Sequence, residues 1–259
     1  MKRLSVSKKL AADGRPQYKI NNKISWTVPG DIHLPFQDKR ALQHITDNPF
    51  GTSGLFITGD LLDYYWLSSW PKLADKTKQA GYTATREALK DLVSSVSNNY
   101  DYVAFGSGNH ELRLETLTRK FPGFDGKWYW IVADLLPTTW TFFDHGYRCE
   151  LSQKTTNGLP ILLEHGDRAL YGGVPSAERL VNAYPGQCTI IGHNHRLQHH
   201  YKTTWKNGRQ TTSMAYTVGH LSDIRKNNYA ANPNWQQGYA TISEDGFIQI
   251  NHLIGGRMI

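Results

Sequence analysis

The sequence contains five short clusters in which glycine stands beside aspartate, asparagine or histidine. The side chains in these clusters that could bind a metal ion are Asp31, His33, Asp60, Asn109, His165, His193 and His195. Carboxylate and amide oxygens together with imidazole nitrogens suit borderline ions such as Mn²⁺, Fe or Zn²⁺. No cysteine is among them, so a structural zinc site built on thiolates is excluded. Seven ligands are too many for one tetrahedral ion, whereas two ions roughly 3.5–4 Å apart can share a bridging carboxylate.

The spacing within two of the clusters suits a shared site. Asp31 and His33 are two residues apart, and so are His193 and His195. On an extended segment, side chains at positions i and i+2 project to the same side, so each pair could contact the same ions. Glycines in the clusters permit tight turns and close approach of the backbone. These glycines are Gly30, Gly59, Gly108 and Gly192.

Each cluster follows a short apolar run of strand length. The five runs are Ile24–Val28, Leu55–Thr58, Tyr102–Phe105, Leu159–Leu163 and Thr189–Ile191. Continuous rather than alternating apolar residues are typical of strands buried on both faces. In α/β sheets, polar site residues gather just beyond the carboxyl ends of the strands. We therefore expect the five clusters to meet at one edge of the fold.

Helical patterns lie between some of these runs. The clearest is Thr83–Val96, in which Ala84, Ala88, Leu92 and Val96 are spaced four apart, and Asp38–Thr46 and Ala177–Ala183 are weaker candidates. Strands that alternate with helices indicate an α/β architecture.

The last third of the chain is expected to form strands. The candidate strands are Ser213–Gly219, Gly238–Ser243 and Phe247–Leu253, and Asp245-Gly246 between the last two is a hairpin signal. We expect these strands to form a second sheet that completes the domain.

Length and composition limit the choice of protein class. A chain of 259 residues fits one large domain, and no apolar run approaches the ~20 residues that span a bilayer, so no membrane partner is expected. The chain has 29 basic and 22 acidic residues, and its charge of +7 favours anionic partners. Two cysteines, Cys149 and Cys188, are too few for a disulfide framework and favour a reducing, cytoplasmic location.

The first 22 residues are basic and lack the apolar stretch of a signal peptide. We expect residues 1–22 to be a flexible, solvated segment, with an arm that binds nucleic acid as the alternative. Residues 23–259 are then a single domain.

The order of the motifs resembles the calcineurin-like metallophosphoesterase superfamily. The motifs are Asp31-x-His33, Gly59-Asp60-x-x-Asp63, Gly108-Asn109-His110-Glu111, His165-Gly166 and Gly192-His193-x-His195. The resemblance implies an α/β fold, a four-layer α/β/β/α sandwich of two mixed sheets flanked by helices. It also implies a dinuclear metal centre on one edge of the sandwich.

The resemblance further implies a role for each site residue. One ion would be held by Asp31, His33, Asp60 and His195, and the other by Asp60, Asn109, His165 and His193, so that Asp60 bridges. Two divalent ions are expected, Mn²⁺ first, with Fe, Zn²⁺, Ni²⁺ or Mg²⁺ as alternatives. A hydroxide between the ions would attack phosphorus in line, and His110 would act as general acid toward the leaving oxygen. Asp63 would orient a ligand, or would be a carboxylate at a helix start.

Two positions depart from the phosphoprotein phosphatase branch of the superfamily. That branch has Arg-Gly after the second aspartate of the Gly-Asp motif, where this chain has Tyr64-Tyr65-Trp66 after Asp63. The branch also has glycine after the first histidine, where this chain has Leu34. The sequence is more similar to the phosphodiesterase and nuclease side, including metallophosphoesterases encoded by bacteriophages.

Several residues could contact the substrate beside Asn109 and His110. The guanidinium of Arg113 could bind a phosphate, or it could pair with Glu111 or Glu115 on a helix surface. Tyr64, Trp66 and their aromatic neighbours Tyr65 and Trp70 could stack on a base, or they could pack the loop against the core. His145, which also precedes a glycine, is a competitor of His165 for the fifth ligand position.

The substrate class follows only in outline from the sequence. The basic residues near or after the last ligands could track a nucleic acid or form a solvated face. They are Arg196, Lys202, Lys206, Arg209, Arg225 and Lys226. We predict a phosphoesterase acting on phosphate mono- or diesters, with a DNA or RNA nuclease as the alternative. A protein phosphatase or a catalytically idle metal-binding protein is a further alternative, and the oligomeric state stays open.

Overall fold

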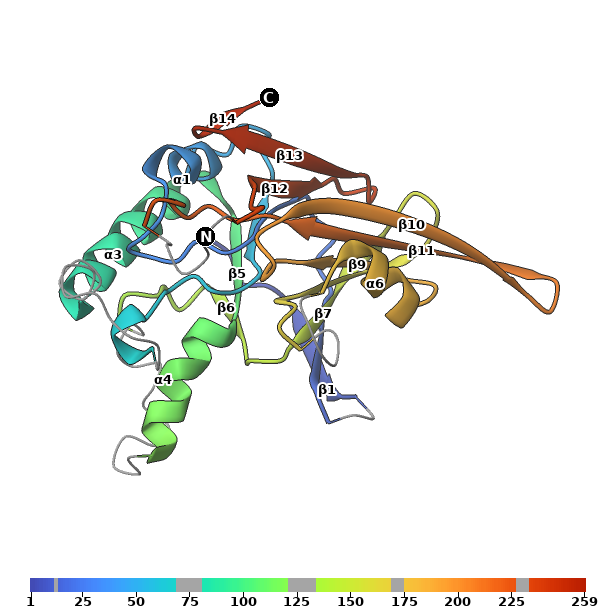
Figure 1. The fold of residues 1–259 in the computed structure, drawn as a ribbon, viewed down its shortest axis with the longest axis horizontal. Helices are drawn as coiled ribbons and strands as arrows, with labels where there is room; N and C mark the ends of the chain where they lie inside the picture. The colour runs from blue at the N-terminus through green and yellow to red at the C-terminus, as the bar shows by residue number, and fades with distance from the viewer. Residues whose placement is uncertain (12–13, 69–80, 121–133, 169–174, 227–232) are drawn as a thin grey trace.

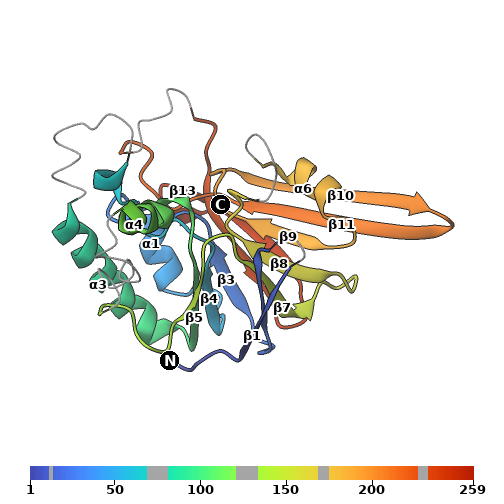
Figure 2. The ribbon, with the colours of Figure 1, turned by 90° about the horizontal axis from the view of Figure 1, so that it is seen from below.

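The computed structural model describes residues 1–11, 14–68, 81–120, 134–168, 175–226 and 233–259. Within these residues the chain forms two mixed sheets of seven strands each, packed face to face (Figures 1 and 2). Helices lie on the outer faces of the two sheets. The expected sandwich of two mixed sheets flanked by helices is confirmed.

The first sheet has the strand order β14-β13-β12-β3-β4-β5-β6. Its strands are β3 (Trp26–Pro29), β4 (Gly54–Ile57), β5 (Tyr102–Gly106), β6 (Thr141–Phe143), β12 (Gln237–Ile242), β13 (Ile248–Ile254) and β14 (Arg257–Met258). The strands β3 to β6 run parallel to one another, and β12 pairs antiparallel with both β3 and β13. The parallel strands therefore all end at the same edge.

The second sheet has the strand order β1-β2-β7-β8-β9-β11-β10. Its strands are β1 (Val6–Leu10), β2 (Pro16–Ile20), β7 (Arg148–Lys154), β8 (Pro160–Glu164), β9 (Cys188–Ile191), β10 (Leu197–Lys206) and β11 (Arg209–Val218). The strands β8, β9 and β11 are parallel. The last strand, β10, pairs antiparallel with β11 along its whole length and forms the edge of the sheet.

The helices are α1 (Lys39–Thr46), α3 (Tyr82–Asn99), α4 (Asn109–Lys120) and α6 (Ala177–Ala183), with a 3₁₀ turn η1 at Tyr65–Leu67. The side chain of Asp38 caps α1 by accepting hydrogen bonds from the backbone N–H groups of Arg40 and Ala41. The predicted helices are confirmed with small shifts at their ends.

Three apolar clusters separate the layers of the sandwich. Along β4, Leu55 and Ile57 face α1 and α3, whereas Phe56 faces the second sheet, because successive side chains point to opposite faces. A small third cluster packs α6, through Leu180, against Ile191 of the second sheet. Because these strands have apolar partners on both faces, their sequences are continuously apolar.

Two expectations about the strands differ from the structure. The last third of the chain does not form a second sheet by itself, because β11 pairs with β9, whereas β12 and β13 extend the first sheet through β3. Part of the basic segment 1–22 is ordered in β1 and β2, and β2 pairs in parallel with β7. That segment is therefore not a solvated tail along its length, while the domain boundary at residue 23 stays a prediction.

In the part of the chain that the structure describes, no helix combines the length and apolar character needed to cross a membrane.

Candidate metal centre

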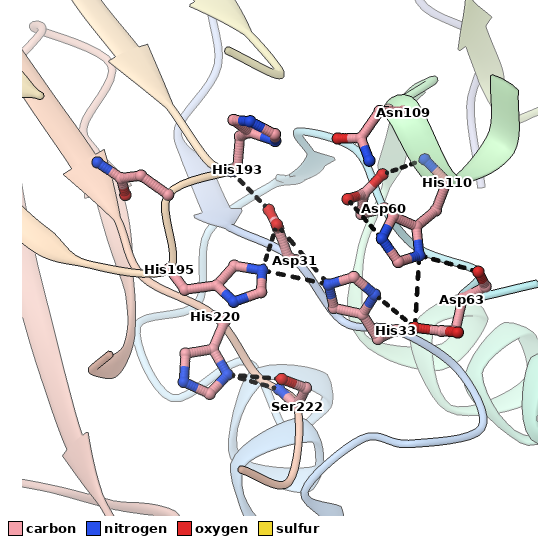
Figure 3. A network of polar contacts seen from close by, with 12 residues as sticks. Asp31, His33, Asp60, Asp63, Asn109, His110, His193, His195, His220 and Ser222 are labelled. Atoms are coloured by element: carbon pink, nitrogen blue, oxygen red, sulfur yellow. Dashed lines mark hydrogen bonds and ion pairs between the residues drawn. The ribbon is translucent and has the colours of Figure 1, made fainter. Parts of the chain in front are cut away.

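The loops that follow β3, β4, β5 and β9 meet at one edge of the sandwich (Figure 3), and the loop after β8 joins them through His165. The first sheet supplies Asp31, His33, Asp60 and Asn109, and the second sheet supplies His165, His193 and His195. All seven residues expected to bind metal are thus brought together. The site spans the junction between the two sheets and depends on their packing.

A first group of ligand atoms belongs to Asp31, His33 and His195, which are all buried. Nε2 of His195 lies 2.8 Å from Oδ2 of Asp31 and 3.2 Å from Nε2 of His33. Nε2 of His33 lies 3.8 Å from the same carboxylate oxygen. Three donor atoms from two sheets therefore converge on one point.

A second group belongs to Asp60, His165 and His193, whose ligand atoms lie within 4.8 Å of one another. Nε2 of His165 lies 3.5 Å from Oδ2 of Asp60 and 3.0 Å from Oδ1 of Asn109. Asp60 also groups with His33 of the first set. It is therefore the carboxylate that lies between the two groups.

The backbone at this edge adopts an uncommon conformation at four of the seven residues. The φ angles are +56° at His33, +47° at Asp60, +62° at His193 and +58° at His195. Left-handed φ at a residue other than glycine costs on the order of 1–3 kcal/mol and persists only where the surroundings fix it. Here the backbone N–H of His193 donates to Oδ1 of Asp31 at 2.8 Å and that of His110 donates to Oδ1 of Asp60 at 2.8 Å.

Three of the glycines are required by close contacts within the site. A Cβ atom on Gly108 would lie 2.2 Å from Oδ1 of Asp60, and one on Gly192 would lie 2.5 Å from Oδ1 of Asp31. At Gly59, φ is +143° and a Cβ atom would lie 2.4 Å from Nδ1 of His165. The close approach of backbone expected from these glycines is confirmed.

Glu111 holds the loops of the first sheet in place, a role that sequence reasoning missed. Its buried carboxylate accepts hydrogen bonds from the backbone N–H groups of Gly108 at 2.8 Å, Asp60 at 3.1 Å and Leu62 at 2.8 Å. Burial, and then the charge of Asp60, raises the pKa of Glu111 to about 7. Glu111 belongs to the Gly-Asn-His-Glu motif but was given no ligand role. An acidic residue in the motif without such a role was the sequence signal for a structural function.

His110, Asp63 and Arg113 form a connected group beside the ligands (Figure 3 labels the first two). Nδ1 of His110 donates to the carbonyl oxygen of Asp63 at 2.9 Å, and Nη2 of Arg113 donates to Nε2 of His110 at 3.0 Å. A carbonyl only accepts and a guanidinium only donates, so in these two bonds Nδ1 of His110 is the donor and Nε2 is the acceptor. Arg113 also contacts the Asp63 carbonyl at 2.8 Å rather than pairing with Glu111, whose carboxylate is bound by the backbone.

The Asp63 carboxylate contacts two imidazole rings of the site. Its Oδ2 lies 3.0 Å from Nδ1 of His33 and 3.4 Å from Nδ1 of His110. The short turn η1 that follows has no side-chain cap, so Asp63 does not serve as a helix-start carboxylate there. Its geometry suits the alternative, which is to orient a ligand histidine.

The electrostatics of the cluster favour positive charge between its carboxylates. Burial would lower the pKa of His33, but the contacts with Asp31 and Asp63 raise it to about 10. Burial would likewise lower the pKa of His165, but the charge of Asp60 raises it to about 10. Burial opposes ionisation of Asp60 as well, yet the charge of His165 and its contact with the carboxylate hold the pKa of Asp60 well below the usual range.

The donor set fits divalent ions by a second observation. Nδ1 of His193 is buried and has no hydrogen-bond partner among the described residues, while the rings of His165 and His195 face the same groups through Nε2. Buried imidazole nitrogens are normally satisfied, and those that are not point to an additional partner. Together with the converging carboxylates, these rings form groups that could hold metal ions.

Three expectations about neighbouring residues can be compared with the structure, and a fourth falls outside the described residues. His145 lies outside the two groups, because its Nε2 contacts Oδ2 of Asp167 at 2.7 Å. Tyr64 is 3% exposed and belongs to the apolar core, so it does not suit the expected stacking on a base. Trp66 packs against the same core, and Trp70 lies outside the described residues.

His220 and Trp235 are neighbours of the site that the sequence did not assign to it. The ring centroids of His220 and His195 are 5.2 Å apart, and the ring centroid of Trp235 lies 4.6 Å from that of His195. Burial, and then the charge of His195, lowers the pKa of His220 to about 3. His220 follows β11 and Gly219, so the pattern of an apolar run followed by a glycine beside Asp, Asn or His occurs here again. That repetition was the available signal, whereas Trp235 had none.

The fold and the site define the class of this chain as an α/β sandwich of two sheets with buried Asp and His groups that could hold metal ions. No family model matches it, and no curated protein matches it. Among solved structures, a conserved uncharacterized protein of Streptococcus pneumoniae, described as a predicted phosphoesterase, aligns with a TM-score of 0.36 at 9% identity over 90% of both chains. A protein from Thermus thermophilus aligns with a TM-score of 0.35 at 11% identity, covering 88% of this chain and 98% of that chain. At this level of similarity, functional inference rests on the chemistry of the site.

Proposed function

We propose that the chain is a dinuclear, metal-dependent phosphoesterase that hydrolyses phosphate mono- or diesters. The observation that carries this proposal is the convergence of two ligand groups, Asp31, His33 and His195 beside Asp60, His165 and His193, at the junction of the sheets. Two separate groups of oxygen and nitrogen donors suit a pair of divalent ions. Asn109 completes the set on the side of the first sheet.

The bound ions would polarise the phosphoryl group and make water acidic enough to act as a nucleophile near neutral pH. The protein holds the donors in place before any ligand binds, through Glu111, Asp63 and the backbone bonds to Asp31 and Asp60. Such preorganisation is what gives a polar site its catalytic value.

Arg113 and His110 provide the groups that act on the substrate. The Arg113 fork lies beside His110 and the Asp63 carboxylate and can bind a phosphate group through two parallel hydrogen bonds. Once Arg113 turns toward a phosphate, Nε2 of His110 is released, and this nitrogen can carry a proton to the leaving oxygen. Nδ1 keeps its bond to the Asp63 carbonyl and fixes the ring. Proton donation of this kind is typically worth about 10²–10⁴ in rate.

The first experiment measures metal content and turnover in the same preparations. The protein is loaded with Mn²⁺, its metal is counted by elemental analysis, and hydrolysis of p-nitrophenyl phosphate and bis-p-nitrophenyl phosphate is followed. We expect about two ions per chain and measurable hydrolysis. Asp31→Asn and His195→Ala should each lower metal content. Full dinuclear occupancy in both variants would overturn the ligand assignment, and a metal-loaded protein inert on both esters would overturn the activity.

The role of His110 has a separate test. His110→Ala should keep its metal content and lose turnover by about 10²-fold or more, because the ring contributes a proton rather than a ligand. The structure makes this test necessary, since ligand atoms of His110, His33 and Asp60 also lie within 4.8 Å of one another. If the variant loses an ion, His110 is a ligand and the proposed acid must be another group.

A further inference from the structure

The strands β10 and β11 form a long two-stranded ribbon that projects away from the sandwich in both views (Figures 1 and 2). Each strand has 10 residues, which corresponds to a length of about 33 Å. Only the part of β11 from Met214 to Thr217 pairs with β9. The outer half therefore has no sheet beneath it in the described structure, and packing of the domain core does not explain it.

The ribbon lies in a stretch of sequence that contains no acidic residue. No Asp or Glu occurs between Glu178 and Asp223, whereas Arg196, Lys202, Lys206 and Arg209 do. In the register of the ribbon, Lys206 and Arg209 are directly opposite each other. A stretch of this charge favours an anionic ligand.

One face of the ribbon carries a row of aromatic side chains. His199, Tyr201 and Trp205 alternate along β10 and so share a face, on which Tyr201 is 53% exposed and Trp205 is 70% exposed. The Tyr201 ring packs edge-on against Tyr216, and the two hydroxyl groups are 3.0 Å apart. Tyr201 is therefore held in a fixed orientation while one side of it faces solvent.

The base of the ribbon is continuous with the metal centre. β10 begins two residues after His195, and β11 ends two residues before His220, whose ring neighbours that of His195. Arg196 is exposed at this base. A ligand that lies along β10 from Trp205 inward would therefore reach the candidate metal centre.

We propose that the β10–β11 ribbon binds single-stranded nucleic acid and directs its phosphodiester backbone toward the metal centre. Exposed aromatic rings stack on unpaired bases of any sequence, and Lys202 and Arg209 on the opposite face of this narrow ribbon can reach the phosphates around its edge. Lys202 contacts the neutral amide of Asn182, so this bond leaves its charge unbalanced. The inference that the bound nucleic acid is also a substrate rests on the proposed phosphoesterase function. The inference that the ribbon binds nucleic acid does not.

A second copy of the chain is the competing occupant, because β10 is an edge strand that could pair with another strand. Two ribbons that each lack acidic residues would repel one another when they pair. The charge of the ribbon therefore favours a polyanion over self-association.

Binding is tested in the presence of a chelator, so that no hydrolysis occurs. Fluorescein-labelled dT₁₂, U₁₂ and a 12-base-pair duplex are titrated with protein, and anisotropy is measured. We expect both single strands to bind more tightly than the duplex. Trp205→Ala and Tyr201→Ala should each weaken binding by about fivefold or more. Tyr82→Ala, which removes an exposed aromatic ring from the start of α3, should leave binding unchanged.

Charge is tested by salt dependence. Arg209→Gln should weaken binding and reduce the slope of log K against log salt by about 0.7, the value for one phosphate contact on a single strand. Arg257→Gln, on the exposed strand β14, should change neither. Equal binding by wild type and by the three ribbon variants, or absence of binding by wild type, would overturn the inference. A dimer that Trp205→Ala converts to a monomer would show a second copy to be the occupant.

A cleavage assay separates this inference from the proposed function. With Mn²⁺ present, the ratio of dT₁₂ or U₁₂ cleavage to bis-p-nitrophenyl phosphate hydrolysis should fall in Trp205→Ala. Hydrolysis of small esters without oligonucleotide binding would overturn the proposed role of the ribbon and support the proposed phosphoesterase activity. Binding that depends on Trp205, with no hydrolysis of either substrate, would support the proposed role of the ribbon and overturn the proposed phosphoesterase activity.

Discussion

At the scale of single residues, the candidate site depends on side chains that form hydrogen bonds to neighbouring loops and contribute no ligand atom. Glu111 is the clearest case, because one carboxylate accepts three backbone N–H groups from two different loops. Its glutamine variant would keep one acceptor oxygen and place an NH₂ group against a backbone donor. The positions of Asp60 and Asn109 would then be less well fixed.

Glu111→Gln is expected to lower the free energy of unfolding by about 1–3 kcal/mol, the cost of one buried donor left without a partner. It should also weaken Mn²⁺ binding, although the residue contributes no ligand atom. Urea unfolding and metal titration measure the two effects. Glu87→Gln on the exposed surface of α3 is the control, and an equally small effect of both variants would contradict the role of Glu111.

Gly108 gives a prediction of a steric kind. In Gly108→Ala, the added Cβ would lie 2.2 Å from Oδ1 and 2.5 Å from the backbone nitrogen of Asp60, so the central carboxylate must move. We expect a loss of about 1–3 kcal/mol in stability and a clear loss of metal binding.

Gly54→Ala is the matched control, because its Cβ would lie 2.5 Å from the Trp26 ring in the core between the sheets, away from the site. It should lower stability while the folded protein keeps its full metal content. Equal metal content in both variants would show that the tight contact at Gly108 is not required by the site.

At the scale of elements, one carboxylate contacts both amino-terminal strands, in addition to the pairing of β2 with β7. Oδ2 of Asp144 accepts hydrogen bonds from the Tyr18 hydroxyl at 2.7 Å and from Nζ of Lys8 at 2.9 Å. These contacts link β1 and β2 to the turn before β7. Burial would raise the pKa of Asp144, but the bonds from Lys8 and Tyr18 lower it.

Asp144→Asn should lower the free energy of unfolding by about 1 kcal/mol near pH 7, most of it through Tyr18, because the Lys8 ammonium is largely exposed. A depressed carboxyl pKa stabilises the fold above the unfolded value near ~3.9 and loses that contribution as pH falls below it. The difference between wild type and variant should therefore shrink below about pH 4. Denaturant titrations at pH 7 and pH 3.5 measure it, with the exposed Asp91→Asn as control. A difference that persists at the lower pH would contradict the linkage.

The sequence predicted those elements whose local residue pattern reflects how they are buried in the fold. Strands β3, β4, β5, β8 and β9 were recognisable because both of their faces are buried, and α6 has the predicted bounds. The strand β10, the outer part of β11 and the strands β1 and β2 are rich in polar and basic residues and resemble exposed segments, so no periodic signal marked them. The sheet to which β11 or β12 belongs depends on long-range pairing, which a local pattern does not encode.

The meeting of the candidate ligand residues at one edge was predictable from the sequence, because their types and their positions after strand-like runs are visible there. The partners of Glu111 and the position of Trp235 beside His195 arise only when separate loops meet. The burial of Tyr64 was equally hidden, because an aromatic residue in a loop can face either the core or solvent.

At the scale of the whole molecule, the candidate centre lies where two sheets meet, and its ligands come from both. The sheets are otherwise held together by the apolar cluster between them, in which Phe56 and Ala104 of the first sheet pack with Leu163 and Ile190 of the second. Ions shared between the sheets would cross-link them close to their edges. Unfolding that separates the sheets would then have to release the ions.

Mn²⁺ is therefore expected to raise the melting temperature in proportion to the logarithm of its concentration. A single ion at 100 times its Kd stabilises the folded state by about 2.7 kcal/mol, and each kcal/mol corresponds to roughly 2–4 °C for a domain of this size. Thermal unfolding at increasing Mn²⁺, against a chelator baseline, measures the shift. His165→Ala should reduce it, whereas His145→Ala, which removes a histidine bound to Asp167, should retain it even if its baseline falls. A shift lost in His145→Ala and kept in His165→Ala would reassign the ligand, and no shift in wild type would mean that ions do not join the two sheets.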